Sequence, residues 1–143
     1  MDDTTVDNSL PEKDSTDEHS QRSLELALAA ARTASENRGG NIVVLDLRGV
    51  TPVFDFFVIA TGSSRRQLHA MSEEIDHRLE DELGDKRMGI EGYSDSRWIL
   101  LDYGTVVIHL FDNDTREYYD IENLWTQAKR IDLTGVIEST PAE

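Results

Sequence analysis

Three groups of residues in this 143-residue chain have types and spacings that could support chemistry. The first group is His69, Glu73 and His77, which recur every four residues as metal ligands on one helical face do. At about 100° per residue, all three lie about 100° to 180° away from Leu68 on the apolar stripe of the same helix. That is the solvated side of the helix, and the sequence therefore predicts no metal site and no cofactor there.

The second group is the turn Gly62-Ser63-Ser64, whose backbone N–H groups could face an anion at the start of a helix. Its strand-Gly-Ser-helix order is similar to that of nucleotidyltransferases, which also need two strand-held carboxylates to bind Mg²⁺. The nearest Asp-x-Asp, Asp112 and Asp114, comes only fifty residues after Gly62, beyond a strand end. The pattern favours a capped helix start, and a nucleotide-binding, transferase-like enzyme is kept as an alternative.

The third group lies in a predicted hairpin from Trp98 to Phe111, folded about a two-residue turn at Tyr103-Gly104. In that register Asp102 faces Thr105. Leu100 then opposes Val107, and Trp98 opposes His109. Because side chains alternate along a strand, five of these residues share one face, with Thr105 at its end: Trp98, Leu100, Asp102, Val107 and His109.

The two faces of this hairpin differ in composition. The opposite face is almost purely aliphatic and is the expected core; it holds Ile99, Leu101, Tyr103, Val106, Ile108 and Leu110. The mixed face has the composition of a protein-binding patch with an aromatic anchor. The same composition also suits a second, partly buried face covered by a helix, with His109 merely hydrogen-bonded. Residue types alone leave both interpretations open.

The remaining elements follow from apolar periodicity and from glycine positions. Leu24, Leu28 and Ala31 have helical spacing, and Gly39-Gly40 ends that helix. Strands are predicted at 42–48 and 54–61, the second with both faces covered. A helix from Ser63 or Ser64 to about Leu83 buries Leu68, Met71, Ile75 and Leu79 and is closed by Gly84. A short segment at 88–92, the hairpin and a final helix capped by Asp120 complete an α/β layer with a mixed sheet.

Composition limits the partners and the compartment. The chain has 29 acidic against 14 basic residues, a formal charge of −15, and no cysteine. Such a chain is repelled by phosphate backbones, which predicts no DNA binding, little RNA contact and a basic protein as partner. It has no apolar run long enough for a membrane span and no secretory signal at its start, so a cytoplasmic protein is expected. No Ser-His-Asp grouping or strand-held carboxylate pair suggests hydrolysis, and nothing in the sequence requires catalysis, so the protein is not expected to be an enzyme.

The ends of the chain are predicted to lie outside the domain. Residues 1–19 carry seven acids against one lysine, a composition typical of a disordered tail. Residues 134–143 are expected to be a flexible C-terminal tail. The folded domain is therefore predicted to span residues 20–133.

Several segments together resemble the Iojap family of ribosomal silencing factors, known as RsfS. They are DFFVIATGSSRRQLHAMSEEI at 55–75, Glu91-Gly92, the hairpin WILLDYGTVVIHLF at 98–111, and REYYDIENLW at 116–125. The resemblance covers about residues 20–131, with the motifs in the family's order. It implies a mixed five-stranded sheet flanked by helices, a nucleotidyltransferase-like fold without the catalytic carboxylates.

The resemblance also implies a function and a partner. Family members bind ribosomal protein fourteen of the large subunit and sterically block association with the small subunit, which represses translation; they are commonly homodimers. A role in large-subunit assembly, as a scaffold, is an alternative. The implied partner surface includes Trp98 and Leu100, and we extend it to Asp102, Tyr103, Thr105, Val107 and His109. Thr105 replaces a second Asp usual in the family's hairpin, so one charged contact is expected to be missing.

Overall fold

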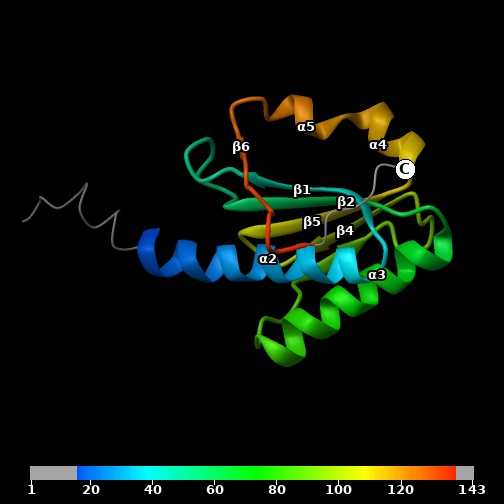
Figure 1. Ribbon diagram of the computed structural model, residues 1–143, viewed down its shortest axis with the longest axis horizontal. Coiled ribbons are helices and arrows are strands. Elements are labelled where there is room, and N and C mark those ends of the chain that lie inside the picture. The colour runs from blue at the N-terminus through cyan, green and yellow to red at the C-terminus, as the bar shows by residue number, and fades with distance from the viewer. Residues whose placement is uncertain (1–15, 138–143) are drawn as a thin grey trace, which may run out of the picture.

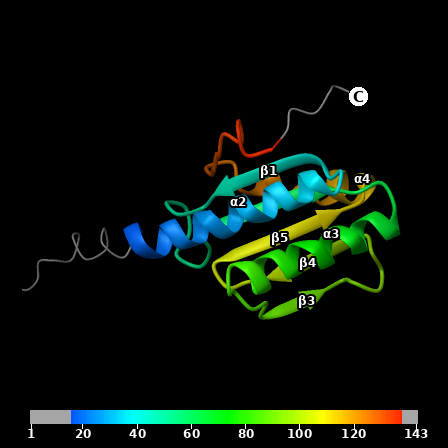
Figure 2. The same cartoon turned by 60° about the horizontal axis from the view of Figure 1, so that its bottom comes forward.

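The computed structural model describes residues 16–137, with side chains from residue 18 onward. These residues form one mixed sheet with helices on both faces (Figures 1 and 2). The helical elements are η1 (Thr16–Ser20), α2 (Gln21–Glu36), α3 (Arg65–His77), η2 (Arg78–Glu82), α4 (Asn113–Tyr119) and α5 (Ile121–Leu124). The strands are β1 (Gly40–Asp46), β2 (Phe56–Thr61), β3 (Gly89–Glu91), β4 (Trp98–Asp102), β5 (Val106–Phe111) and β6 (Lys129–Arg130).

The sheet has six strands in the order β3-β4-β5-β2-β1-β6. Only β2 and β5 run parallel, and every other neighbouring pair is antiparallel. The predicted mixed sheet is therefore confirmed, while the predicted count of five strands is wrong. The missed strand, β6, has only two residues, both charged, and no apolar pattern marks such a strand. The implied relation to the nucleotidyltransferase fold stays a prediction.

Two apolar layers sandwich the central strands. Helices α2 and α3 cover one face, and α4 and α5 lie on the other (Figure 1). Every residue of β2 and β5 is buried, as the apolar run at 54–61 predicts for a strand covered on both faces. Below the sheet, the stripe Leu68, Met71, Ile75 and Leu79 is fully buried, which confirms the expected face of α3 and η2.

Helix α2 packs through small residues. Its buried positions include five alanines, at 27, 29, 30, 31 and 34, which let the helix lie close to β1 and β2. The predicted helix is confirmed; of the residues whose spacing predicts it, Ala31 is buried, and Leu28 is only half-buried and lies outside both core clusters. Leu26 occupies the buried position instead. In an alanine-rich helix most positions can face the core, so the leucines alone do not identify the buried side.

The C-terminal third departs furthest from the predictions. Helix α4 is absent from them; its N-terminus is capped by Asp112, whose Oδ1 accepts the Thr115 N–H at 2.8 Å. The prediction that Asp120 caps the last helix is wrong, because its side chain makes no capping bond and its backbone is left-handed, with φ +48°. The carbonyl of Asp120 accepts the Asn123 N–H instead. Asp120 is therefore the joint between two short helices.

The structure describes residues on both sides of each predicted tail boundary, and the bounds of the domain stay a prediction. Thr16–Ser20 forms the helical turn η1, and Ser20 is buried. At the other end Leu133 and Ile137 pack against the core under α2, and Arg32 donates to the Val136 carbonyl. The remaining parts of the two predicted tails, residues 1–15 and 138–143, lie outside the described residues.

Arg116 links helices α4 and α5 to strands β1 and β2. Its guanidinium makes two bonds to Glu122, at 2.8 and 3.2 Å, and donates to the Asn41 carbonyl and to Thr61 Oγ1 at 2.7 and 2.8 Å. Both members of the ion pair are largely buried. The bonds from Arg116 lower the pKa of the Glu122 carboxyl, with Arg130 adding a weaker attraction.

We expect Arg116→Ala to lower the free energy of unfolding by about 3 kcal/mol, because it leaves the Glu122 carboxylate without its main partner. Arg130→Ala is the matched control. The Arg130 guanidinium lies 3.9 Å from the same carboxylate but is 62% exposed, so its loss should cost less than about 0.5 kcal/mol. Urea unfolding of both variants measures the two losses of stability. Equal losses would contradict the role of Arg116 as the main partner of Glu122.

Candidate functional site

The β4–β5 hairpin turns one position later than predicted. Trp98 pairs with Phe111, Leu100 with His109 and Asp102 with Val107. The Tyr103 N–H donates to the Val106 carbonyl, so the two turn residues are Gly104 and Thr105. Glycine then takes the first central position, with φ +93°, as in a type II′ turn. The predicted pairing is wrong by two residues, and because two is the period of a strand, the assignment of side chains to faces is unchanged.

One face of this hairpin is incompletely covered. On β4, the outward-facing Trp98, Leu100 and Asp102 are half-buried, although Ile99 and Leu101 between them are fully buried. Trp98 and Leu100 border the cluster formed by the sheet and α5, which includes Phe57 and Ile121. We call Trp98, Leu100 and Asp102 the hairpin face. It offers a large aromatic ring, an aliphatic side chain and a carboxylate that also accepts the Gly104 N–H at 2.8 Å.

The other predicted site residues lie in different surroundings. Val107 and His109 lie on β5, on the same side of the sheet as the hairpin face. Both are buried, each 4% exposed, because neighbouring side chains cover them. Tyr103 points to the opposite core, and its hydroxyl donates to Asp76 Oδ1 at 2.7 Å. Burial and this bond raise the pKa of Tyr103. Thr105 is exposed in the turn, and its hydroxyl lies 2.9 Å from that of Ser23.

His109 orients the aromatic ring of the hairpin face. Trp98 Nε1–H donates to His109 Nδ1 at 3.1 Å, which places the proton of the neutral imidazole on Nε2. Phe57 packs against the imidazole edge to face, with ring centroids 4.5 Å apart. Nε2 is the one buried side-chain nitrogen or oxygen among residues 18–137 without a hydrogen-bond partner. Burial lowers the pKa of His109 to about 4, so the ring is neutral at pH 7.

This lowered pKa makes stability depend on pH in a defined direction. Below pH 6.5 the unfolded chain binds a proton at His109 that the folded protein excludes until about pH 4. Stability from this residue is therefore complete above pH 6.5 and is lost as the pH falls, by about 2 kcal/mol at about pH 5. Urea unfolding of the wild type and His109→Leu at several pH values tests this. The variant should lose less stability over this range, and parallel curves would contradict the prediction.

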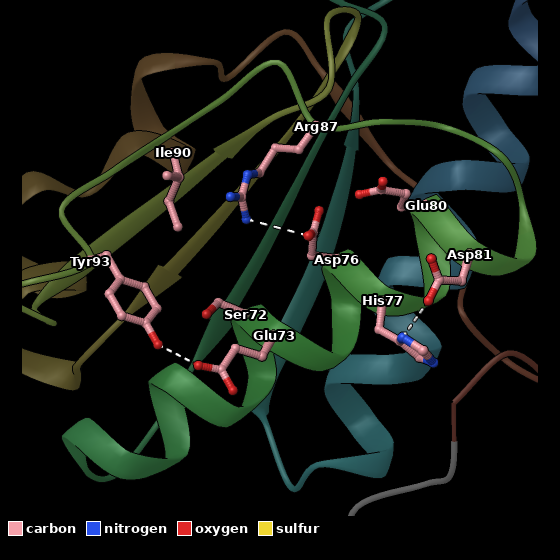
Figure 3. Close-up of a pocket in the computed structure, with 9 residues that line it drawn as sticks. All are labelled: Ser72, Glu73, Asp76, His77, Glu80, Asp81, Arg87, Ile90 and Tyr93. Atoms are coloured by element: carbon pink, nitrogen blue, oxygen red, sulfur yellow. Dashed lines mark hydrogen bonds and ion pairs between the residues drawn. The ribbon is translucent and has the colours of Figure 1, made fainter.

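A cavity of about 580 Å³ lies between α3, η2 and β3. Figure 3 shows three pairs among its polar side chains: Tyr93 with Glu73, Arg87 with Asp76, and His77 with Asp81. The bond from Tyr93 to Glu73 raises the pKa of the tyrosine. His69 is also occupied, since its Nε2 lies 2.8 Å from the Tyr93 carbonyl oxygen. Among the described side chains no three His, Asp or Glu residues are placed to hold a metal.

The Gly62-Ser63-Ser64 turn has little left to offer an anion. The Gly62 N–H donates to the Phe111 carbonyl, and the Ser63 N–H donates to Gln67 Oε1 at 2.6 Å. Ser64 caps α3 by accepting the Gln67 N–H, as the sequence predicts. The alternative of a nucleotide-handling enzyme is also weakened, because the carboxylate of Asp112, one of its two candidate Mg²⁺ ligands, caps α4. This turn is thus an internally bonded helix start.

Sequence reasoning missed two residues beside the hairpin face. Tyr118 and Tyr119 lie on the unpredicted helix α4, and the Tyr119 ring centroid is 4.8 Å from that of Trp98. Both tyrosines are exposed. The paired aromatic residues in REYYD were a signal, because two adjacent tyrosines cannot both face the core from a single helix turn.

The fold is that of an α/β protein with a mixed sheet, and one face of its hairpin is incompletely covered. The family model described as "Ribosomal silencing factor during starvation" matches residues 20–143, and the chain belongs to this family. It is 36% identical to the ribosomal silencing factor RsfS of Halalkalibacterium halodurans, over 79% of this chain and 96% of the relative. It is 40% identical to that of Bacillus subtilis, over 73% and 87%.

The chain is also similar to a mammalian mitochondrial protein and to two solved bacterial structures. The mouse "mitochondrial assembly of ribosomal large subunit protein 1" is 41% identical, over 50% of this chain and 32% of the mouse protein. A crystal structure of a Chromobacterium violaceum protein superposes with a TM-score of 0.66 at 36% identity, covering 74% of this chain and 85% of that one. A Bacillus halodurans structure gives 0.64 at 34% identity, covering 79% and 99%.

Proposed function

We propose that this protein is a ribosomal silencing factor that binds the large ribosomal subunit through its ribosomal protein fourteen. Occupancy of that site sterically blocks the small subunit from docking and represses translation. The protein acts as a cytoplasmic homodimer. Membership of the silencing-factor family and the names of its relatives support a role at the large subunit. Within residues 16–137, no helix is long and apolar enough to cross a membrane.

The observation that carries the proposal is the incompletely covered hairpin face. Trp98 and Leu100 supply apolar contact area beside the carboxylate of Asp102, a combination typical of binding surfaces. The charge of −15 favours a basic ribosomal protein over ribosomal RNA as the contact. The mechanism requires occupancy alone, so no catalytic group is needed.

Subunit joining tests the proposal. Large subunits incubated with the protein are mixed with small subunits, and association is followed by light scattering. We expect slower and less complete joining, in proportion to the fraction of large subunits occupied. Joining at an unchanged rate and extent with the protein bound would contradict silencing. Sedimentation velocity of the free protein tests the homodimer, since a single monomeric species at micromolar concentration would contradict it.

A role as an assembly scaffold for the large subunit is the second candidate, favoured by the name of the mouse relative. The two functions differ in the particle on which they act. A silencer prevents the joining of mature subunits, whereas a scaffold leaves mature subunits free to join and its loss causes immature large subunits to accumulate. Sucrose-gradient profiles of cells lacking the protein, taken together with the joining assay, separate the two.

A further inference from the structure

A groove of about 600 Å³ lies beside the hairpin face, between the start of β4 and helix α4. We propose that this groove binds a lysine- or arginine-bearing segment of the same large-subunit protein that contacts the hairpin face. The inference rests on the proposed function and adds the chemistry of the contact. The residues that carry it are Trp98, Tyr118, Tyr119, Asp95, Arg97 and Asp114.

The aromatic side of the groove is continuous and open. The Trp98 and Tyr119 ring centroids are 4.8 Å apart, and those of Tyr119 and Tyr118 are 5.0 Å apart and nearly perpendicular. Tyr118 is 81% exposed and Tyr119 49%. An ammonium or guanidinium group over the face of such a ring is attracted by its quadrupole. The tyrosines extend the apolar contact of Trp98 while favouring a cation.

The charges around the groove favour the same occupant. Residues 91–122, which include the hairpin and α4, carry eight acidic residues against two arginines. One of these, Arg116, is already bonded to Glu122. Asp95 and Asp114 line the groove, and Arg97 is the one basic residue in its lining. A basic protein segment is attracted by this excess of negative charge, whereas a phosphate backbone is repelled.

The chain's own N-terminal segment is a poorer occupant of the groove. Residues 1–15 contain five acids and one lysine, so their charge has the same sign as that of the groove. Like charges brought together raise the energy of contact, and a cationic segment from another molecule avoids this. The charge of the groove therefore favours a basic segment of another molecule over this chain's own N-terminal segment.

The test measures binding of fluorescently labelled full-length protein to purified large ribosomal subunits. We expect Tyr118→Ala to weaken binding about fivefold, and Tyr118→Phe, which keeps the ring, to bind as the wild type does. The double variant Asp95→Lys with Asp114→Lys should lose about tenfold or more, and its binding should depend less on salt. Leu124→Ala is the matched control, because Leu124 is 73% exposed but lies on α5, outside the groove.

A photoreactive benzophenone at position 118 identifies what occupies the groove. Cross-linking to a lysine- or arginine-containing peptide of the large-subunit protein that contacts the hairpin face supports the inference, and cross-linking to another protein or to ribosomal RNA overturns it. If Trp98→Ala weakens binding while Tyr118→Ala and the double lysine variant do not, the inference fails and the proposed function stands. If the wild type does not bind large subunits, both fail.

Discussion

Replacing Trp98 by alanine should weaken binding to the large ribosomal subunit about thirtyfold or more, a loss of about 2 kcal/mol, as truncation of an aromatic anchor does. Trp98 is the largest side chain of the hairpin face, and it also contacts Tyr119 on α4. One substitution thus removes contact area from the hairpin face and from the neighbouring groove.

The Trp98→Ala variant should remain folded, because Trp98 is only half-buried and the opposite core under β4 is unaffected. It should lose about 1 to 2 kcal/mol of stability, since His109 Nδ1 loses its donor. Co-sedimentation with large subunits, alongside circular dichroism, separates binding from folding. Leu124→Ala again serves as the control for an exposed apolar truncation. A folded Trp98→Ala protein with unchanged retention would exclude Trp98 from the contact.

The second large effect is expected at Gly92, which follows β3. Its φ is +79°, and a Cβ placed there would lie 2.0 Å from the Trp98 carbonyl oxygen. Gly92→Ala must therefore strain the backbone and also push the polypeptide away from the start of β4. We expect a loss of at least about 3 kcal/mol in the free energy of unfolding.

Gly84→Ala is the matched control for Gly92→Ala. Gly84 has a similar φ of +73°, but a Cβ added there would have no atom within 4 Å, so the substitution costs only the backbone strain, about 1 kcal/mol. Urea unfolding of both variants isolates the contribution of the steric overlap. Because the overlap is with the Trp98 backbone, Gly92→Ala should also weaken large-subunit binding, and Gly84→Ala should not. Equal stability losses would contradict this explanation.

The sequence predicted well those parts of the fold in which the apolar pattern is strong. Strand β2 is an unbroken apolar run, the stripe from Leu68 to Leu79 has a clear helical period, and both lie where expected. The division of the hairpin into two faces survived an error in its turn, because the error shifted the pairing by one strand period. The turn itself was misplaced because Gly104 occupies its first central position rather than its second.

The site was harder to predict than the core. Sequence alternation puts Val107 and His109 on the face of Trp98, but it cannot show that neighbouring side chains cover them. Helix α4 has no buried residue and hence no apolar period, so Tyr118 and Tyr119 could not be placed beside Trp98. Strand β6 exists because Lys129 and Arg130 pair with β1, a long-range contact that local propensity does not encode.

The hydrogen bond between Trp98 and His109 has a consequence for selectivity. The indole has a single N–H, and that donor is directed inward to an imidazole of its own protein. A partner that covers Trp98 can therefore meet only carbon surface and π-electrons there. An acceptor placed opposite the ring would be dehydrated without compensation, so the contact discriminates against a partner that places an acceptor there. The ring is recognised by its shape and its π-face rather than by a hydrogen bond.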